Sequence, residues 1–181
     1  MSVIYGKRIR LRAPEREDIP IFTRWFSDPE VTHGLALYLP FSIAEEELWF
    51  DNMLKRPPEE HPLTIEVKKG DGWTVIGNMG FFDINKVAHS VEVGIVIGEK
   101  GYWNQGYGTE AMKLMLKHGF NTLNLHRIML KVYAYNERAI RAYEKAGYVL
   151  EGRLRDAIYR DGEYHDILLM SVLRSEWQPE D

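Results

Sequence analysis

The chain has 181 residues, of which 45% are hydrophobic and 28% charged, a composition that predicts one globular domain over residues 1–181. Its formal net charge of -4 excludes the broad positive surface typical of nucleic-acid-binding proteins, so we expect no nucleic-acid partner. The absence of cysteine excludes disulfides and a cysteine nucleophile. We find no apolar run typical of a signal peptide or a membrane span, and we therefore expect a cytoplasmic protein with no membrane partner.

The first third of the chain alternates between a short strand pattern and two helical patterns. Apolar and charged residues alternate over 8–12, which predicts a strand that ends before Pro14. Apolar residues recur at helical spacing over 15–26, until Ser-Asp-Pro ends the pattern. Ser42 and Glu45 have the spacing of a capping box and predict a second helix that ends before Pro57.

The rest of the chain mixes strands and helices. Three strand-like segments joined by hairpin turns predict an antiparallel meander, at Leu63–Val67, Trp73–Phe82 and Ser90–Ile97. The remaining predicted elements are a helix at Tyr107–Phe120, a strand at Ile128–Val132, a helix at Glu137–Ala146, and strands at Tyr148–Leu154 and Ile167–Leu173. Strand, helix and strand in succession indicate a crossover, so the mixed order predicts a single α/β or α+β domain.

A glycine-bearing turn connects the strand at 90–97 with the helix that follows. Gly106 and Gly108 remove side chains just before a helix start, where backbone N–H groups and the helix dipole favour an anion. The turn is therefore a candidate phosphate cradle, although glycines at a turn can serve backbone geometry alone. A dinucleotide fingerprint is less favoured, because the next strand carries no acid at its tip, and Gly-Lys-Ser/Thr of a Walker loop is absent.

Two segments together point to a family. Trp103–Gly108 follows the pattern of Arg or Gln, two residues, Gly, one residue, and Gly or Ala, except that Trp103 stands at the first position. A second segment, 136–148, carries Asn, Ala, Tyr, Lys and Gly at matching offsets. In both segments the chain resembles the GNAT superfamily of acyl-CoA-dependent N-acetyltransferases. A Trp at the first signature position is similar to the subgroup that contains ribosomal-protein N-terminal acetyltransferases and spermidine acetyltransferases.

The resemblance implies a fold and a site for acetyl-CoA. The fold is a single-domain GNAT α/β (α+β) fold, with a mixed central sheet of about seven strands flanked by about four helices. Acyl-CoA lies in a cleft between the splayed fourth and fifth strands. The residues implied in binding acetyl-CoA are Ile95, Val96, Ile97, Trp103, Asn104, Gln105, Gly106, Tyr107, Gly108, Thr109, Asn136, Ala139 and Lys145.

The resemblance also implies catalytic residues. Tyr143 matches the family's general acid beside the thioester sulfur, whereas its helical spacing alone would equally suit a core aromatic. Asn136 would bond the pantetheine and is also a good helix cap. Glu92 shares an outward strand face with Gly94, which would leave room for substrate, so we consider it as a base or an amine-positioning group; the alternative is a solvated surface carboxylate.

The expected reaction moves an acetyl group from acetyl-CoA to a primary amine by direct attack in a ternary complex. The acceptor is expected to be a polyamine or a protein or peptide N-terminus, and the alternative is a non-catalytic CoA-binding module of the same fold. Glu45, Glu46, Glu47 and Asp51 could attract a cationic amine, but the pattern favours a solvated helix face.

The remaining expectations concern the acceptor walls, metals and assembly. The family's acceptor site implies contributions from Leu35, Leu37, Tyr38, Phe41, Tyr159 and Tyr164. The six histidines are scattered without paired ligand spacing, so no metal is expected. The resemblance is compatible with a homodimer.

Overall fold

The computed structural model describes residues 3–179, which form five α-helices and eight β-strands. Contacts divide these residues into two compact units, one comprising 3–81 with 95–107 and the other 82–94 with 108–179. Strands β4 (Gly72–Asn85) and β5 (Ser90–Ile97) each run from one unit into the other. Among the described helices, none is long and apolar enough to cross a membrane.

The structure has one strand and one α-helix more than we predicted, and both are short. Strand β1 (Ile4–Tyr5) pairs antiparallel with β2 (Ile9–Arg12). Helix α2 (Pro29–Thr32) begins where we predicted only the end of a helix. Pro29 stands in its first turn, and the Asp28 side chain accepts a hydrogen bond from Glu30 N at 3.0 Å. Pro after an Asx cap can start a helix as well as end one, and we predicted only the end.

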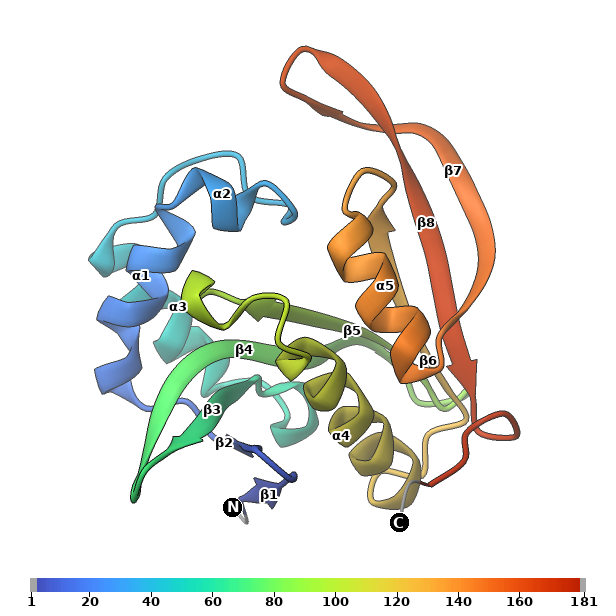
Figure 1. Cartoon of the computed structure of the whole chain (residues 1–181), viewed down its shortest axis with the longest axis horizontal. Helices are drawn as coiled ribbons and strands as arrows, with labels where there is room; N and C mark the ends of the chain where they lie inside the picture. Colours follow the sequence, from blue (N-terminus) through green and yellow to red (C-terminus); the bar gives the residue numbers. More distant parts are fainter. Residues whose placement is uncertain (1–2, 180–181) are drawn as a thin grey trace. The chain divides into compact units, whose positions relative to one another are not determined.

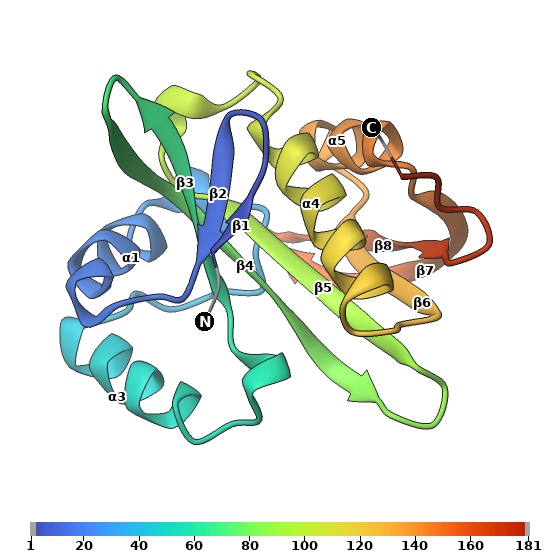
Figure 2. The same cartoon turned by 90° about the horizontal axis from the view of Figure 1, so that it is seen from below.

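The first unit pairs β2 with β3 (Leu63–Lys69) and β3 with β4, all antiparallel, which confirms the start of the predicted meander. Helices α1 (Ile19–Phe26) and α3 (Ile43–Met53) pack together through Ile19, Phe50 and Met53. Figure 2 shows these two helices side by side. The capping box of Ser42 and Glu45 forms as predicted, with Glu45 N donating to Ser42 Oγ at 3.2 Å.

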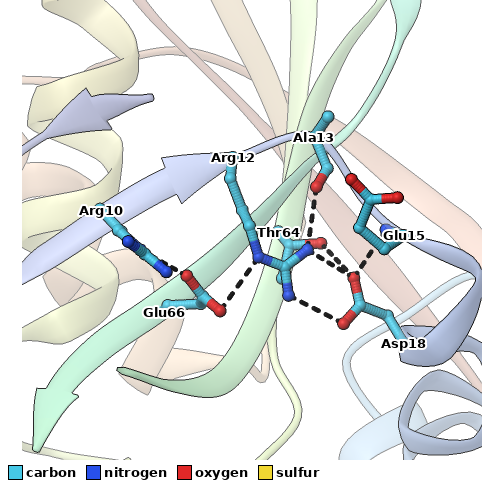
Figure 3. A network of polar contacts seen from close by, with 7 residues as sticks. All are labelled: Arg10, Arg12, Ala13, Glu15, Asp18, Thr64 and Glu66. Atoms are coloured by element: carbon cyan, nitrogen blue, oxygen red, sulfur yellow. Dashed lines mark hydrogen bonds and ion pairs between the residues drawn. The ribbon is translucent and has the colours of Figure 1, made fainter. Parts of the chain in front are cut away.

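A buried ionic network joins β2 and β3 to the turn that leads into α1 (Figure 3). Arg12 donates to both carboxylate oxygens of Asp18, at 2.7 and 2.9 Å. Glu66 bridges Arg12 and Arg10, at 3.0 and 2.6 Å. Thr64 adds a hydrogen bond to Asp18 at 3.2 Å. Asp18 and Glu66 are buried, so their charges are tolerated because each is paired and hydrogen-bonded.

The second unit contains the predicted crossover. Strand β5 pairs in parallel with β6 (Arg127–Tyr133), from Ser90 with Arg127 to Glu92 with Met129. Strand β6 then pairs antiparallel with β8 (Glu163–Leu173), and β7 (Val149–Arg160) forms a long hairpin with β8. Helices α4 (Tyr107–Asn121) and α5 (Glu137–Ala146) lie side by side in both views (Figures 1 and 2).

Candidate active site

The turn before α4 has a backbone that suits an anion. Asn104 and Gly106 have positive φ angles of 59° and 82°, whereas Gln105 between them does not. Alternation of φ sign over successive residues is the geometry of backbone nests that bind anions through their N–H groups. Gly106 adopts this conformation without the strain that a side chain would add. The turn therefore fits the phosphate cradle predicted from the glycines.

Side chains within the first unit fix this turn. The Trp103 indole Nε1 donates to the carbonyl of Ile97 at 2.6 Å, which ties the turn to the end of β5. Gln105 Nε2 donates to the carbonyl of Gly101 at 2.6 Å. Trp103 also packs on the cluster of Phe22, Trp25, Val31 and Val96. These bonds assign Trp103 and the Gln105 side chain to holding the shape of the turn.

The end of β5 lies close to β4 within the first unit. Val96 is buried, and Ile95 and Ile97 are half-buried. A Cβ added to Gly77 would lie 2.2 Å from the carbonyl oxygen of Val96, so only glycine fits there. The predicted pantetheine edge at Ile95–Ile97 is therefore held against β4 by a close backbone approach.

The first turn of α4 contacts α5 inside the second unit. Thr109 Oγ1 donates to the carbonyl of Ala142 at 3.4 Å. Ala142 directly precedes Tyr143, so the start of α4 lies near the predicted general acid. The backbone N–H groups of Gly108 and Thr109 lie in the first turn of a helix, where no carbonyl of the same helix can accept from them.

Helix α5 presents the predicted residues of the second motif. Asn136 caps the helix, since its Oδ1 accepts from Ala139 N at 3.3 Å, and Gly147 ends the helix with a φ of 102°. Tyr143 is half-buried and packs against Tyr148, with ring centroids 6.0 Å apart. Burial raises the pKa of Tyr143 to about 12, so its hydroxyl stays protonated at neutral pH. Lys145 is exposed.

The environment of Glu92 differs from the prediction. Glu92 is buried, and its Oε2 accepts from Lys131 Nζ of β6 at 2.8 Å, so it is not a solvated surface carboxylate. The expected open space beside Gly94 is also absent, because a Cβ added there would lie 3.1 Å from the Phe82 ring. Both differences arise from strand pairing. Lys131 and Phe82 belong to neighbouring strands, and their positions beside Glu92 are not visible in the sequence around it.

The acidic run at the start of α3 is only partly solvated. Glu45 serves the capping box and Glu47 is exposed, but Glu46 is buried at 3% exposure. Within the described part of the chain, the Glu46 side chain has neither a hydrogen bond nor an ion pair, although its backbone N–H donates to the Ser42 carbonyl at 3.1 Å. Burial, and to a lesser extent the neighbouring charge of Glu45, raises the pKa of Glu46 to about 7. The prediction of a solvated face was wrong for this residue, because position 46 shares a helix face with Phe50 and Met53.

The residues expected to shape the acceptor site occur in two places. In the first unit, Leu35 packs on the Phe22 cluster, and Phe41 contacts Phe26 with ring centroids 6.2 Å apart. Tyr38 is exposed and Leu37 is half-buried. In the second unit, Tyr159 and Tyr164 face each other across the β7–β8 hairpin with centroids 4.9 Å apart. Both remain exposed, so they are available to a ligand.

Comparisons with known proteins agree with the motif assignment. A family model described as an acetyltransferase (GNAT) domain matches residues 8–149. An uncharacterized N-acetyltransferase of Bacillus licheniformis is 31% identical, over 98% of this chain and 99% of that protein. Spermidine N(1)-acetyltransferase of Escherichia coli is 33% identical, over 95% of this chain and 89% of that protein.

A solved structure agrees over nearly the whole chain. The crystal structure of spermidine N-acetyltransferase from Vibrio cholerae, in complex with CoA and spermine, matches with a TM-score of 0.85 and 26% identity. The match covers 94% of this chain and 98% of the other.

Proposed function

The chain belongs to the GNAT acetyltransferase family, and from this premise we propose that it acetylates a cationic primary amine, with a polyamine ranked ahead of a protein or peptide N-terminus. The observation that carries acetyl-CoA binding is the turn at Asn104–Gly106, whose alternating φ signs and glycine suit a pyrophosphate. The proposed domain is the whole chain, and the proposed location is the cytoplasm, since a cysteine-free chain suits a reducing compartment.

The proposed binding mode uses backbone groups for most contacts. The N–H groups of the turn from Gln105 to Thr109 would hold the pyrophosphate. In the first unit, the edge at Ile95–Ile97 would contact the pantetheine, and in the second unit the family resemblance implies a contact to acetyl-CoA from Asn136. Ala139 and Lys145 of α5 would line the same ligand. Trp103 and Asn104 would act by fixing the turn, as the Trp103–Ile97 hydrogen bond supports.

Bound acetyl-CoA supplies an activated acetyl thioester. In the proposed reaction the neutral amine nitrogen attacks the thioester carbon, the C–S bond breaks, and the leaving thiolate must be stabilised. Tyr143 would donate a hydrogen bond or a proton to this sulfur, and its raised pKa keeps the donor hydrogen in place. No covalent intermediate with the protein is needed, because both substrates are held together in one complex.

Glu92 is the proposed acceptor of the proton that leaves the ammonium, through a water molecule. A Glu92→Gln variant should therefore flatten the acid limb of the pH profile of kcat/KM. An unchanged pH profile would reduce Glu92 to a structural link between β5 and β6.

A cationic acceptor is supported by charge in the first unit. Glu46 is a buried carboxylate, and Glu47 adds an exposed negative charge on the same helix. An ammonium group would stabilise an ionised Glu46 that otherwise lies in an apolar environment. Similarity to the spermidine acetyltransferases of Escherichia coli and Vibrio cholerae also supports a polyamine.

The deciding experiment measures CoA thiol release from acetyl-CoA with polyamines, N-terminal peptides and amino sugars as acceptors. The protein contains no cysteine, so it gives no background with a thiol reagent. Release with polyamines is the expected result. Release only with N-terminal peptides or amino sugars would refute the ranking of acceptors. If no amine causes CoA release but acetyl-CoA still raises the melting temperature of the protein, the result would favour a CoA-binding module.

The role of Tyr143 is tested separately. Tyr143→Phe should lower kcat by about a hundredfold and leave acetyl-CoA affinity within about twofold, because only the donor is lost. Tyr148→Phe is the matched control, since it removes a buried hydroxyl from the partner ring of the same aromatic pair. Unchanged turnover in Tyr143→Phe would refute the general-acid assignment.

A further inference from the structure

A cation from the N-terminal part of the chain contacts the turn assigned to the pyrophosphate. Arg8 Nη1 donates to the carbonyl of Gln105 at 3.0 Å, across 97 residues of sequence. The Arg8 guanidinium carbon also lies 4.4 Å from the centroid of the Tyr107 ring. Two independent contacts therefore hold the guanidinium at this turn, and both lie within the first unit.

The main chain of Arg8 is held in place by the neighbouring strands. Its carbonyl accepts from Lys68 N at 3.0 Å, next to the ladder of β2 and β3. Gly6 N donates to the carbonyl of Ile9 at 2.8 Å, which closes the turn between β1 and β2 around Arg8. The side chain thus starts from a fixed backbone, which lowers the entropy lost when its guanidinium binds a ligand.

The guanidinium covers the side-chain face of Gly106. A Cβ added to Gly106 would lie 3.4 Å from Arg8 Nη2, and no other described atom outside the adjoining residues is as near. The positive charge is therefore adjacent to the backbone that carries the alternating φ signs.

The turn has no cationic side chain of its own. Residues 103–109 read Trp-Asn-Gln-Gly-Tyr-Gly-Thr, without Lys or Arg. At the first position of the signature, where Arg can stand, the indole of Trp103 donates to Ile97 instead. Backbone N–H groups at a helix start contribute only about half an elementary charge. Arg8 adds a full positive charge to a turn whose own backbone offers only partial charges to a doubly charged pyrophosphate.

We propose that Arg8 binds the pyrophosphate of the acyl-CoA substrate, an inference that rests on the proposed function. A guanidinium presents five N–H donors in a planar fork, and in Arg8 the Nη1 group donates to the Gln105 carbonyl. The fork matches phosphate oxygens better than the single ammonium of a lysine. The N-terminal turn between β1 and β2 is therefore part of the cosubstrate site, although it is distant in sequence from both family motifs.

The test compares three ligands that share the acetyl-pantetheine arm and differ beyond it. These are acetyl-CoA, acetyl-dephospho-CoA, which keeps the pyrophosphate and adenosine but lacks the 3′-phosphate, and S-acetyl-pantetheine, which lacks both the pyrophosphate and the adenosine. Dissociation constants are measured by calorimetry, or by ligand-dependent melting temperature at millimolar ligand, for wild type, Arg8→Ala, Arg8→Lys and Lys7→Ala. Lys7 is the matched control, because it is an exposed cation next to Arg8 in the same turn.

We expect Arg8→Ala to bind acetyl-CoA and acetyl-dephospho-CoA about tenfold more weakly and S-acetyl-pantetheine as well as the wild type does. Arg8→Lys should show a smaller loss, and Lys7→Ala should stay within about twofold for all three ligands. The affinity of Arg8→Ala for acetyl-CoA should also depend less on salt concentration than that of the wild type. Arg8 is exposed, so its variants should melt at the wild-type temperature without ligand.

Several results would overturn the assignment. Equal losses for all three ligands would mean that Arg8 only shapes the turn, and no loss would mean that it does not take part. A loss limited to acetyl-CoA would move the contact to the 3′-phosphate. Wild-type protein that binds none of the three ligands would refute the proposed function itself, and the role of Arg8 with it.

Discussion

Replacing Glu46 by Gln isolates the free-energy cost of burying an ionised carboxylate in the first unit. Burial raises the pKa of Glu46 from its ordinary value of 4.5 to about 7. Each tenfold change in an ionisation constant corresponds to about 1.4 kcal/mol, so the difference amounts to about 3 kcal/mol. Well below pH 4.5 the side chain is neutral in both the folded and the unfolded chain, and no cost arises.

The sign of the effect follows from proton binding. Between pH 4.5 and about 7, the folded protein keeps the proton on Glu46 and the unfolded chain releases it, so the free energy of unfolding falls as pH rises. Glu46→Gln removes this dependence, because its amide stays neutral. The variant should exceed the wild type's free energy of unfolding by only about 1 kcal/mol at pH 5 and by about 3 kcal/mol at pH 8.5.

Urea unfolding followed by tryptophan fluorescence at both pH values measures this difference directly, and equal slopes against urea would show that the same surface is exposed on unfolding. Glu47→Gln is the control, because Glu47 lies on the same helix and is exposed. An equal difference between the variant and the wild type at both pH values would refute an ionisation cost at Glu46. This cost would also be refuted if the variant were less stable at pH 8.5, since the ionised carboxylate would then have a stabilising partner.

Three further substitutions test other contacts. Gly98→Ala should lower the free energy of unfolding by about 1–3 kcal/mol in urea titrations, because the added Cβ would lie 2.0 Å from the Trp25 ring; wild-type stability would contradict this packing. Asp18→Asn should lower the free energy of unfolding by about 3 kcal/mol, because it removes one of the carboxylates paired with Arg12. The difference from the wild type should shrink as pH falls through the lowered pKa of Asp18, because the wild type then loses the same ion pair. Gly106→Ala should raise the calorimetric dissociation constant for acetyl-CoA by about tenfold, because alanine disfavours a φ of 82°; an unchanged constant would remove this turn from the binding site.

Local rules explain why much of the fold was predictable from sequence. The capping box at Ser42, the helix over 137–146 and its stop at Gly147 all depend on hydrogen bonds within a few residues, and the structure confirms each of them. The crossover is confirmed by the parallel pairing of β5 and β6. The two strands predicted for the last hairpin were too short. In the structure β7 extends to Arg160 and β8 starts at Glu163, and the added residues are mostly polar and carry no alternating pattern.

The structure adds backbone geometry to the predicted glycine turn. Glycines before a helix indicate an anion site, and the structure adds the alternating φ signs at Asn104 and Gly106. The sequence also identified Tyr143 by motif spacing, but its raised pKa depends on burial beside Tyr148, which the structure supplies. The roles of these residues in catalysis and binding remain predictions that the variants above test.

The sequence by itself determined the family, the two motifs and most of the helices and strands, because these depend on near neighbours along the chain. Only the tertiary structure decided what surrounds each charged side chain. Glu92 meets Lys131 through strand pairing, Glu46 turns into the core with its helix face, and Arg8 reaches Gln105 across 97 residues. Coulomb energy and desolvation depend on distance in space and not on separation in sequence, so these environments could not be read from the chain alone.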